Sequence, residues 1–169
     1  LEQIYDDVIM YGEPWPQGGD AENHLGYQGA VSWVGDRLAQ AYGVGGFNDK
    51  MRDALRGGAW GGAQPGWVQG NSENMWNIIN GIRGTIQGES TLNPTKVVNY
   101  VSCHDNYTLY DQLASNRIDS NDFNRTYKQA ETMIFTAQGV PFLQEGEDFM
   151  RTKVNKRGTS GKYDHNSYN

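Results

Sequence analysis

The sequence has a single cysteine and no long apolar run, and each absence excludes a class of protein. One thiol, Cys103, can form neither an internal disulfide nor a cysteine-built zinc site. No window approaches the roughly 20 apolar residues that a helix needs to span a bilayer. The first seven residues lack the basic and apolar blocks of a signal peptide. We therefore expect no transmembrane helix and no membrane partner.

Positive charge is also scarce. The chain has 14 Lys and Arg residues against 20 Asp and Glu residues, which gives a formal net charge of −6. A nucleic-acid binder needs a basic face that neutralises phosphates, so we expect no nucleic-acid partner. A basic run near the carboxyl end is interpreted as the face of a loop: Arg151, Lys153, Lys156, Arg157 and Lys162.

Glycine and aromatic residues, by contrast, are abundant. The 169 residues, enough for one ordinary domain, include 22 Gly, 5 Trp, 10 Tyr and 5 Phe. The glycines predict many tight turns. The aromatic residues fit either a surface that stacks on flat ligands or a loop-rich domain with aromatic side chains in its core, and composition alone favours the core.

The order of periodic segments predicts an α/β fold. Short apolar runs that end in Gly, Pro or polar residues are typical of strands, which we expect within 4–13, 43–49, 96–103 and 140–143. Residues 8–11 should be buried on both faces. Helical spacing predicts helices over 28–42, 72–84 and 120–138, with a helical turn at 51–55 and a glycine-rich loop over 57–70. This alternation predicts a parallel sheet with crossover helices.

Polar side chains follow each predicted strand, at Glu13, at 48–49, at 104–106 and at 145–147. Ligands of parallel α/β proteins bind at the carboxyl ends of the strands, so this pattern predicts a site there. Glu13 stands between an apolar run and Trp15. Desolvation would raise the pKa of its carboxyl, which suits a general acid; the alternative is a turn residue that points into water.

The pair His104 and Asp105 ends the clearest predicted strand. A carboxylate beside an imidazole can bind sugar hydroxyls and stabilise developing positive charge, whereas the alternative is a histidine that satisfies a local carbonyl. The adjacent Cys103 also raises a thiol-protease hypothesis. We disfavour it because neighbouring side chains on a strand point to opposite faces.

Three acidic residues near the carboxyl end, Glu145, Glu147 and Asp148, could suggest a metal site. No histidine has metal-ligand spacing to them, and the EF-hand pattern is absent. We interpret them as solvated carboxylates or as salt-bridge partners of Arg151 and Lys153.

Five motifs in a fixed order resemble a known family. They are YGEPW at 11–15, FNDKMRD at 47–53, VNYVSCHDN at 98–106, QGVPFLQEGEDFMRTK at 138–153 and DHNSYN at 164–169. Together they resemble the second half of the catalytic domain of type I pullulanases, starch-debranching enzymes of the α-amylase superfamily (glycoside hydrolase family 13). The resemblance covers nearly the whole chain, and the order of the motifs makes it specific.

The resemblance implies retaining hydrolysis of α-1,6-glucosidic branch linkages in pullulan, starch or glycogen-type α-glucans. Glu13 would be the general acid/base. Asp105 would bind sugar hydroxyls and stabilise the oxocarbenium-like transition state, and His104 would hydrogen-bond the same sugar. Trp15 would stack on a glucan ring, and Asn106 would contact the glucan.

The same resemblance implies a (β/α)8 barrel, of which residues 1–169 would hold about strands 5–8 with their helices and no second domain. A whole barrel takes about 250 residues. The family's nucleophile, an Asp in an Arg-x-Asp setting at the end of the fourth strand, has no counterpart before Glu13. Retaining hydrolysis needs two carboxyl groups about 5–5.5 Å apart. We therefore expect a fragment that is inactive alone.

The open strand edges of such a fragment would invite self-association or pairing with the missing half-barrel. No cofactor is expected in this segment, and the superfamily's structural calcium sites would lie mostly in the other half. The sequence does not indicate a compartment.

Two alternatives stay open within the α-glucan assignment. One is a non-catalytic α-glucan-binding fragment that uses Trp15, Trp60, Trp67 and Tyr168. The other is an α-amylase relative that acts on α-1,4 linkages, because such relatives share the acid/base and the His-Asp pair.

Overall fold

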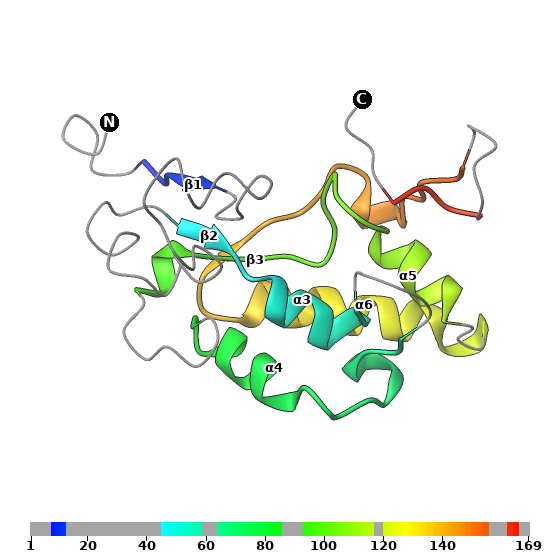
Figure 1. Ribbon diagram of the computed structural model, residues 1–169, viewed down its shortest axis with the longest axis horizontal. Coiled ribbons are helices and arrows are strands. Elements are labelled where there is room, and N and C mark those ends of the chain that lie inside the picture. The colour runs from blue at the N-terminus through cyan, green and yellow to red at the C-terminus, as the bar shows by residue number, and fades with distance from the viewer. Residues whose placement is uncertain are drawn as a thin grey trace, which may run out of the picture.

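The computed structural model describes residues 8–12, 45–58, 64–85, 93–116, 120–155 and 162–165. Within these ranges four short strands form one parallel sheet whose order follows the chain (Figure 1). The strands are β1 (Tyr11–Gly12), β2 (Gly45–Phe47), β3 (Val97–Asn99) and β4 (Val140–Pro141). The predicted α/β fold with a parallel sheet is confirmed, although each strand is shorter than its apolar run.

Four helices accompany the strands in the described part of the chain: α3 (Asp49–Arg56), α4 (Met75–Ile82), α5 (Leu109–Ser115) and α6 (Ser120–Thr136). Single 3-10 turns add η2 (Trp67–Gln69), η3 (Pro94–Lys96) and η4 (Glu147–Phe149). The helix predicted over 28–42 lies outside the described residues. The sequence pattern did not predict α5, which is too short for helical periodicity to stand out.

Local side chains explain where two of these helices begin. The side chain of Asn48 accepts a hydrogen bond from the Met51 amide at 3.1 Å and caps α3. Thr108 caps α5 in the same way, because its hydroxyl accepts from the Asp111 amide at 3.1 Å. The capping residue of α4 is Asn74, two positions after the predicted Ser72.

The core lies between the sheet and the helices that cover one of its faces (Figure 1). The predicted inner face of α6 is confirmed, because Tyr127, Ala130 and Ile134 are all buried. They pack in one cluster with side chains from the other helices and from the segment after β3: Met51, Leu55, Ile78, Val101, Leu109 and Leu113. Most of the core is therefore helical, and β3 connects it to the sheet.

Aromatic rings from β1, from β2 and from the residues directly after β3 and β4 meet on the other face of the sheet. The ring of Phe47 lies 5.6 Å from that of Tyr11, 5.0 Å from that of Tyr100 and 5.3 Å from that of Phe142. The rings of Tyr11 and Phe142 are themselves only 6.4 Å apart. In a flat sheet β1 and β4 would stand about 14 Å apart, too far for upright side chains to touch. The sheet is therefore strongly curved, and the aromatic face is concave.

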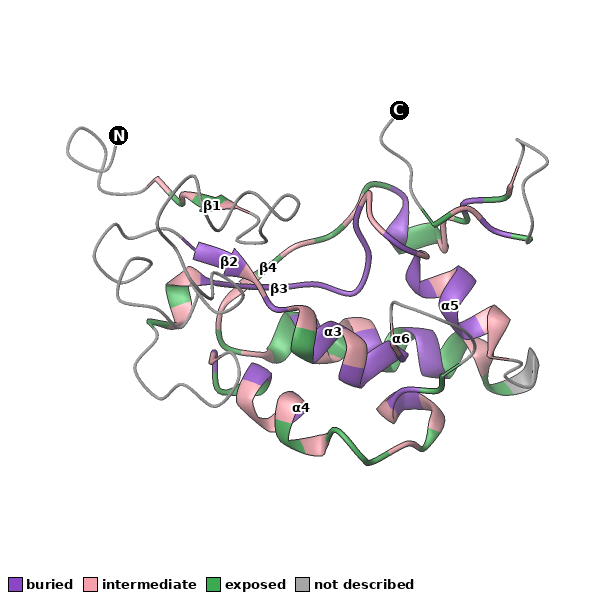
Figure 2. Ribbon diagram, viewed as in Figure 1, coloured by how far each residue is buried: buried purple, intermediate pink, exposed green. Residues whose placement is uncertain are grey.

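Burial differs sharply between the strands (Figure 2). All three residues of β3 are buried, whereas Ile9 is 52% and Tyr11 48% exposed. The prediction that residues 8–11 are buried on both faces is wrong, because β1 is the edge strand of the described sheet and pairs there with β2 alone. No helix in the described ranges is long and apolar enough to cross a bilayer.

Candidate active site at the carboxyl edge of the sheet

Because all four strands are parallel, their carboxyl ends lie at one edge of the sheet, and the described polar residues after β2 and β3 lie there. Beyond β3 the chain runs to a turn at residues 104–106 and then enters α5. His104 and Asp105 are half-buried there, while Asn106 is 2% exposed. The φ angle of Asn106 is 60°, a left-handed conformation that non-glycine residues rarely adopt. A turn with this geometry needs support from its surroundings.

That support comes first from Lys153, which lies 47 positions after Asn106 in the sequence. Its Nζ donates hydrogen bonds to the carbonyl oxygens of Cys103, His104 and Asn106 at 2.9, 2.8 and 2.7 Å. Lys153 is 6% exposed, and burial lowers the pKa of its ammonium to about 8. The prediction that Lys153 belongs to the face of a loop is therefore wrong: the run is polar, but this side chain turns inward to satisfy buried carbonyls.

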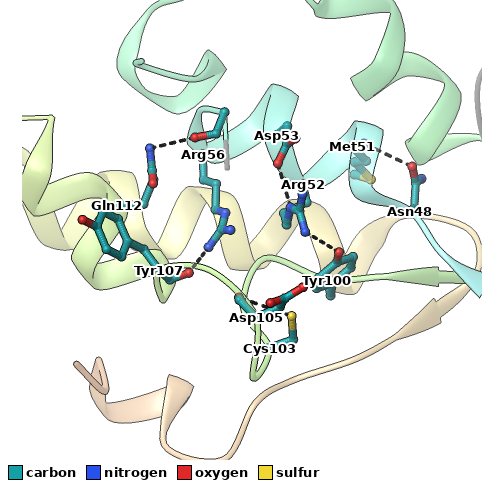
Figure 3. A network of polar contacts seen from close by, with 11 residues as sticks. Asn48, Met51, Arg52, Asp53, Arg56, Tyr100, Cys103, Asp105, Tyr107 and Gln112 are labelled. Atoms are coloured by element: carbon teal, nitrogen blue, oxygen red, sulfur yellow. Dashed lines mark hydrogen bonds and ion pairs between the residues drawn. The ribbon is translucent and has the colours of Figure 1, made fainter. Parts of the chain in front are cut away.

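A second buried cation holds the next part of the turn (Figure 3). The guanidinium of Arg56, which is wholly buried at the end of α3, donates to the carbonyl oxygen of Tyr107. Burial lowers the pKa of Arg56 to about 10. The remaining carbonyl of the turn, that of Asp105, accepts a weak bond from the Cys103 thiol at 3.5 Å. Side chains thus satisfy every backbone carbonyl from 103 to 107.

The same thiol bears on the protease hypothesis. Burial raises the pKa of Cys103, which disfavours the thiolate that a nucleophile requires. Lys153 and the Arg56 guanidinium bond to carbonyls of the turn rather than to the sulfur. The described geometry therefore gives Cys103 a structural role.

Arg52, one helical turn before Arg56, also connects α3 to the segment after β3 (Figure 3). Its Nε lies 2.7 Å from a carboxylate oxygen of Asp53, and another of its nitrogens donates to the Tyr100 hydroxyl at 2.6 Å. Burial opposes the charge of Arg52, but the neighbouring Tyr100 and Asp53 outweigh it and raise the pKa of the guanidinium. Burial also raises the pKa of Tyr100. Arg52 therefore holds Tyr100, the first residue after β3, in place.

The acidic residues after β4 divide into exposed and buried. Glu145 and Asp148 are exposed, whereas Glu147 is 3% exposed. One Glu147 carboxyl oxygen accepts from the Gln144 amide at 2.9 Å, and burial raises the pKa of the carboxyl to about 7. The interpretation of Glu147 as a solvated carboxylate is wrong, because η4 turns its side chain inward. No cluster of three or more His, Cys, Asp or Glu side chains that could hold a metal exists among the described residues.

Of the predicted site residues, the structure brings His104, Asp105 and Asn106 together in one turn. Glu13 and Trp15 lie outside the described residues, as do Trp60 and Tyr168. Trp67, a candidate for glucan stacking, packs against the core from η2.

The buried cations of the site were not foreseen. A sequence signal exists for Arg56, which follows Arg52 by four positions and so shares its helix face. The polar run around Lys153 gives no such signal.

No family model matches the chain, but several known proteins do. The chain is 30% identical over 152 residues to the pullulanase of Bacillus subtilis (strain 168), a match that covers 86% of this chain and 20% of that protein. It is 27% identical over 154 residues to pullulanase A of Streptococcus pneumoniae, covering 87% of this chain and 12% of that protein. The chain spans a fifth or less of these curated relatives' length.

Solved structures give the same result. The pullulanase from Bacillus acidopullulyticus superposes with a TM-score of 0.75 at 31% identity, covering 98% of this chain and 19% of that one. A mutant pullulanase from Paenibacillus barengoltzii, complexed with maltotriose, gives a TM-score of 0.73 at 27% identity, covering 98% of this chain and 25% of that one.

The parallel sheet and its polar carboxyl edge define an α/β protein of the type that binds ligands where strands end. Within that class the chain is a pullulanase-like segment, and the resemblance inferred from its motifs is confirmed.

Proposed function

We propose that the chain supplies the carboxyl half of a (β/α)8 barrel, residues 1–169, in an enzyme that hydrolyses α-1,6 branch linkages of α-glucans with retention. The observation that carries this proposal is the turn after β3, which presents His104 and Asp105 at the sheet edge where β1 also ends, in a chain similar to pullulanases. Gly12 is the last residue of β1, and Glu13 follows it in the sequence.

Two features of the sheet support the barrel. The strand order β1-β2-β3-β4 follows the chain without the reversal typical of doubly wound sheets. The ring contacts between Tyr11 and Phe142 require a curved sheet with its aromatic side chains on the concave face. In a closed barrel this face becomes the packed interior.

The roles of individual residues follow from the family resemblance and from general glycosidase chemistry. Glu13 protonates the leaving oxygen and later activates water. Asp105 binds sugar hydroxyls and stabilises the positive charge that develops on the ring, and His104 donates to the same sugar. Trp15 stacks on a glucan ring, with Asn106 beside it. The nucleophilic carboxylate comes from outside this chain, so the segment is inactive by itself.

An α-glucan is the proposed substrate. The pullulanase of Paenibacillus barengoltzii is recorded in complex with maltotriose and that of Bacillus subtilis str. 168 in complex with maltose, and both superpose on this chain. The proposal includes no cofactor in this segment, with any structural calcium in the other half of the enzyme. It also includes association, with a second copy or with the other half of the barrel, through β1 and β4, the two outer strands of the described sheet.

The test is made in the full-length protein that carries this chain. Replacement of Glu13→Gln should lower kcat on pullulan by at least 10²-fold, because general acid catalysis is worth about 10²–10⁴. The matched control is Glu73→Gln, an exposed carboxyl before α4, which should leave the rate unchanged. On an activated aryl glucoside, whose leaving group needs no protonation, azide should restore turnover to Glu13→Ala, because it attacks the glycosyl-enzyme in place of activated water. A Glu13→Gln enzyme with near-normal turnover would refute the assignment.

Two further readouts separate the alternatives. Cleavage of pullulan at α-1,6 linkages releases maltotriose, whereas an α-1,4-acting relative would release trisaccharides that retain the α-1,6 bond. Calorimetric titration of the 169-residue chain with maltotriose, alongside an activity assay, tests the binding role. If the chain binds maltotriose and the full-length protein shows no turnover, a non-catalytic α-glucan-binding protein is favoured.

A further inference from the structure

In the turn that carries His104 and Asp105, side chains donate hydrogen bonds to consecutive backbone carbonyls. Its five carbonyls, from Cys103 to Tyr107, accept from side chains that come from elsewhere in the chain or from the turn itself. Buried carbonyls without donors cost about 1–3 kcal/mol each, so the conformation of this turn depends on the groups that satisfy them.

Lys153 satisfies three of the five. An ammonium has three N–H donors, and all three are used at 2.7–2.9 Å. Charge-assisted bonds of this length are stronger than bonds between neutral groups, and at 6% exposure water competes little for them. Three carbonyls that converge on one nitrogen leave the backbone between them few alternative conformations. The directions in which the side chains of residues 104–106 leave that backbone are thereby set.

The lysine is itself held from both sides. The Asp111 carboxylate, from the first turn of α5, accepts from the Lys153 amide at 2.7 Å and from the Thr152 hydroxyl. The Lys153 carbonyl accepts from the Asp164 amide at 2.7 Å, beside the antiparallel bridge between Val154 and Tyr163. The backbone of Lys153 is thus hydrogen-bonded to α5, the helix that follows the turn. This bond fixes the position of the Lys153 ammonium relative to the turn.

We propose that Lys153 is a positioning residue of the active site: its ammonium, bonded to the carbonyls of Cys103, His104 and Asn106, sets the orientation in which His104 and Asp105 meet the substrate. This inference rests on the proposed function. Lys153 acts through the turn and makes no contact with the sugar. A misplacement of about 1 Å in a catalytic group can cost about 10²-fold in rate, so the effect should fall on turnover.

The first variant is Lys153→Met in the full-length protein, which keeps the length of the side chain and removes all three donors. We expect kcat on pullulan to fall 10- to 100-fold while KM changes less than threefold, because other glucan contacts remain. The matched control is Lys128→Met, an exposed lysine on α6, which should leave both constants unchanged. A Lys153→Met enzyme with kcat within twofold of the parent would overturn the proposal.

A second variant covers the case in which Lys153→Met does not fold. Lys153→Arg keeps the buried charge, but a planar guanidinium cannot direct three N–H bonds from one nitrogen. Assayed well below its thermal midpoint, it should be folded by circular dichroism and still lose at least tenfold in kcat. A folded Lys153→Arg enzyme with normal kcat would reduce Lys153 to a stabilising residue and refute the proposal.

The Glu13→Gln variant separates the two levels of inference. If Glu13→Gln is inactive and both Lys153 variants are normal, the positioning role fails while the proposed function stands. If Glu13→Gln itself is normal, the proposed function fails first.

Discussion

The side-chain amide of Asn48 donates a hydrogen bond to the side-chain oxygen of Asn99 at 2.9 Å, and both residues are 1% exposed. This bond joins the end of β2 to the end of β3 on the helix-covered face. Asn99 also donates to the Gln138 carbonyl at 2.9 Å, just before β4. One asparagine therefore links the end of β2, the end of β3 and the residue that leads into β4.

Removal of this link should weaken the whole sheet. Asn99→Ala in the full-length protein leaves the Asn48 amide and the Gln138 carbonyl without their partner, so we expect a loss of about 2–4 kcal/mol in the free energy of unfolding. Urea denaturation followed by tryptophan fluorescence measures it. Asn124→Ala, at an exposed position of α6, is the control and should change stability by less than about 0.5 kcal/mol. Equal stability of the two variants would contradict the role of Asn99.

Glu147 should make stability depend on pH. Its pKa in the folded protein is about 7, against 4.5 for a glutamate in water, because burial disfavours the carboxylate. Between those values the folded state binds more protons than the unfolded state. Stability should therefore fall as pH rises from about 4.5 to 7, by up to about 3 kcal/mol, and this contribution should be constant above pH 7.

Glu147→Gln should remove that dependence, since an amide does not titrate. The groups around the carboxyl are the Gln144 amide, Ser102, Glu131 and Arg56, and they remain in the variant. Thermal midpoints measured from pH 4 to 8 give the comparison, with the exposed Glu145→Gln as the control. If the parent and Glu147→Gln lose stability in parallel over this range, another group is responsible.

Gly81 allows α4 to approach α3 closely. A Cβ atom at this position would lie 2.2 Å from the Met51 sulfur, and Met51 is fully buried. We therefore expect Gly81→Ala to lower the free energy of unfolding by about 1–3 kcal/mol, despite the better helix propensity of alanine. Denaturant unfolding of the double variant Gly81→Ala/Met51→Ala, compared with Met51→Ala alone, checks the cause. Next to the smaller side chain at position 51, the glycine change should cost less than it does in the parent. If it costs as much, the steric explanation fails.

In the full-length protein, Asp105→Asn changes one side chain of the site and keeps the backbone carbonyls that Lys153 contacts. If Asp105 stabilises charge on the sugar ring, kcat on pullulan should fall by about 10²–10³ while the thermal midpoint moves little. The exposed Asp122→Asn serves as the control. Retention of more than a tenth of the parent rate would exclude Asp105 from the reaction.

The sequence predicted the elements whose signals are local. Apolar runs ended by Gly or Pro predicted the four strands, and helical spacing predicted α6 with its buried residues, since both depend on near neighbours in the chain. It also predicted that polar residues after the strands lie at one edge, because parallel pairing requires it.

The fates of individual polar residues could not be predicted in this way. Glu147 and Lys153 stand in a run that reads as solvated, yet both are buried. Lys153 is held by carbonyls 47 to 50 positions earlier, and Glu147 lies beside Ser102, 45 positions earlier, contacts that no local pattern reveals. Similarly, residues 8–11 carry the composition of a central strand, but β1 lies at the edge of the sheet that the described residues form.

By itself, then, the sequence determined the α/β alternation, the parallel sheet and the similarity to pullulanases, because these follow from periodicity and from ordered motifs. Only the tertiary structure decided what holds the His104–Asn106 turn. The five carbonyls from Cys103 to Tyr107 accept hydrogen bonds from side chains, and most of these side chains reach them only because the chain folds. Here the donors are the Cys103 thiol, an arginine about 50 residues earlier and a lysine about 50 residues later, which the fold brings to the same place.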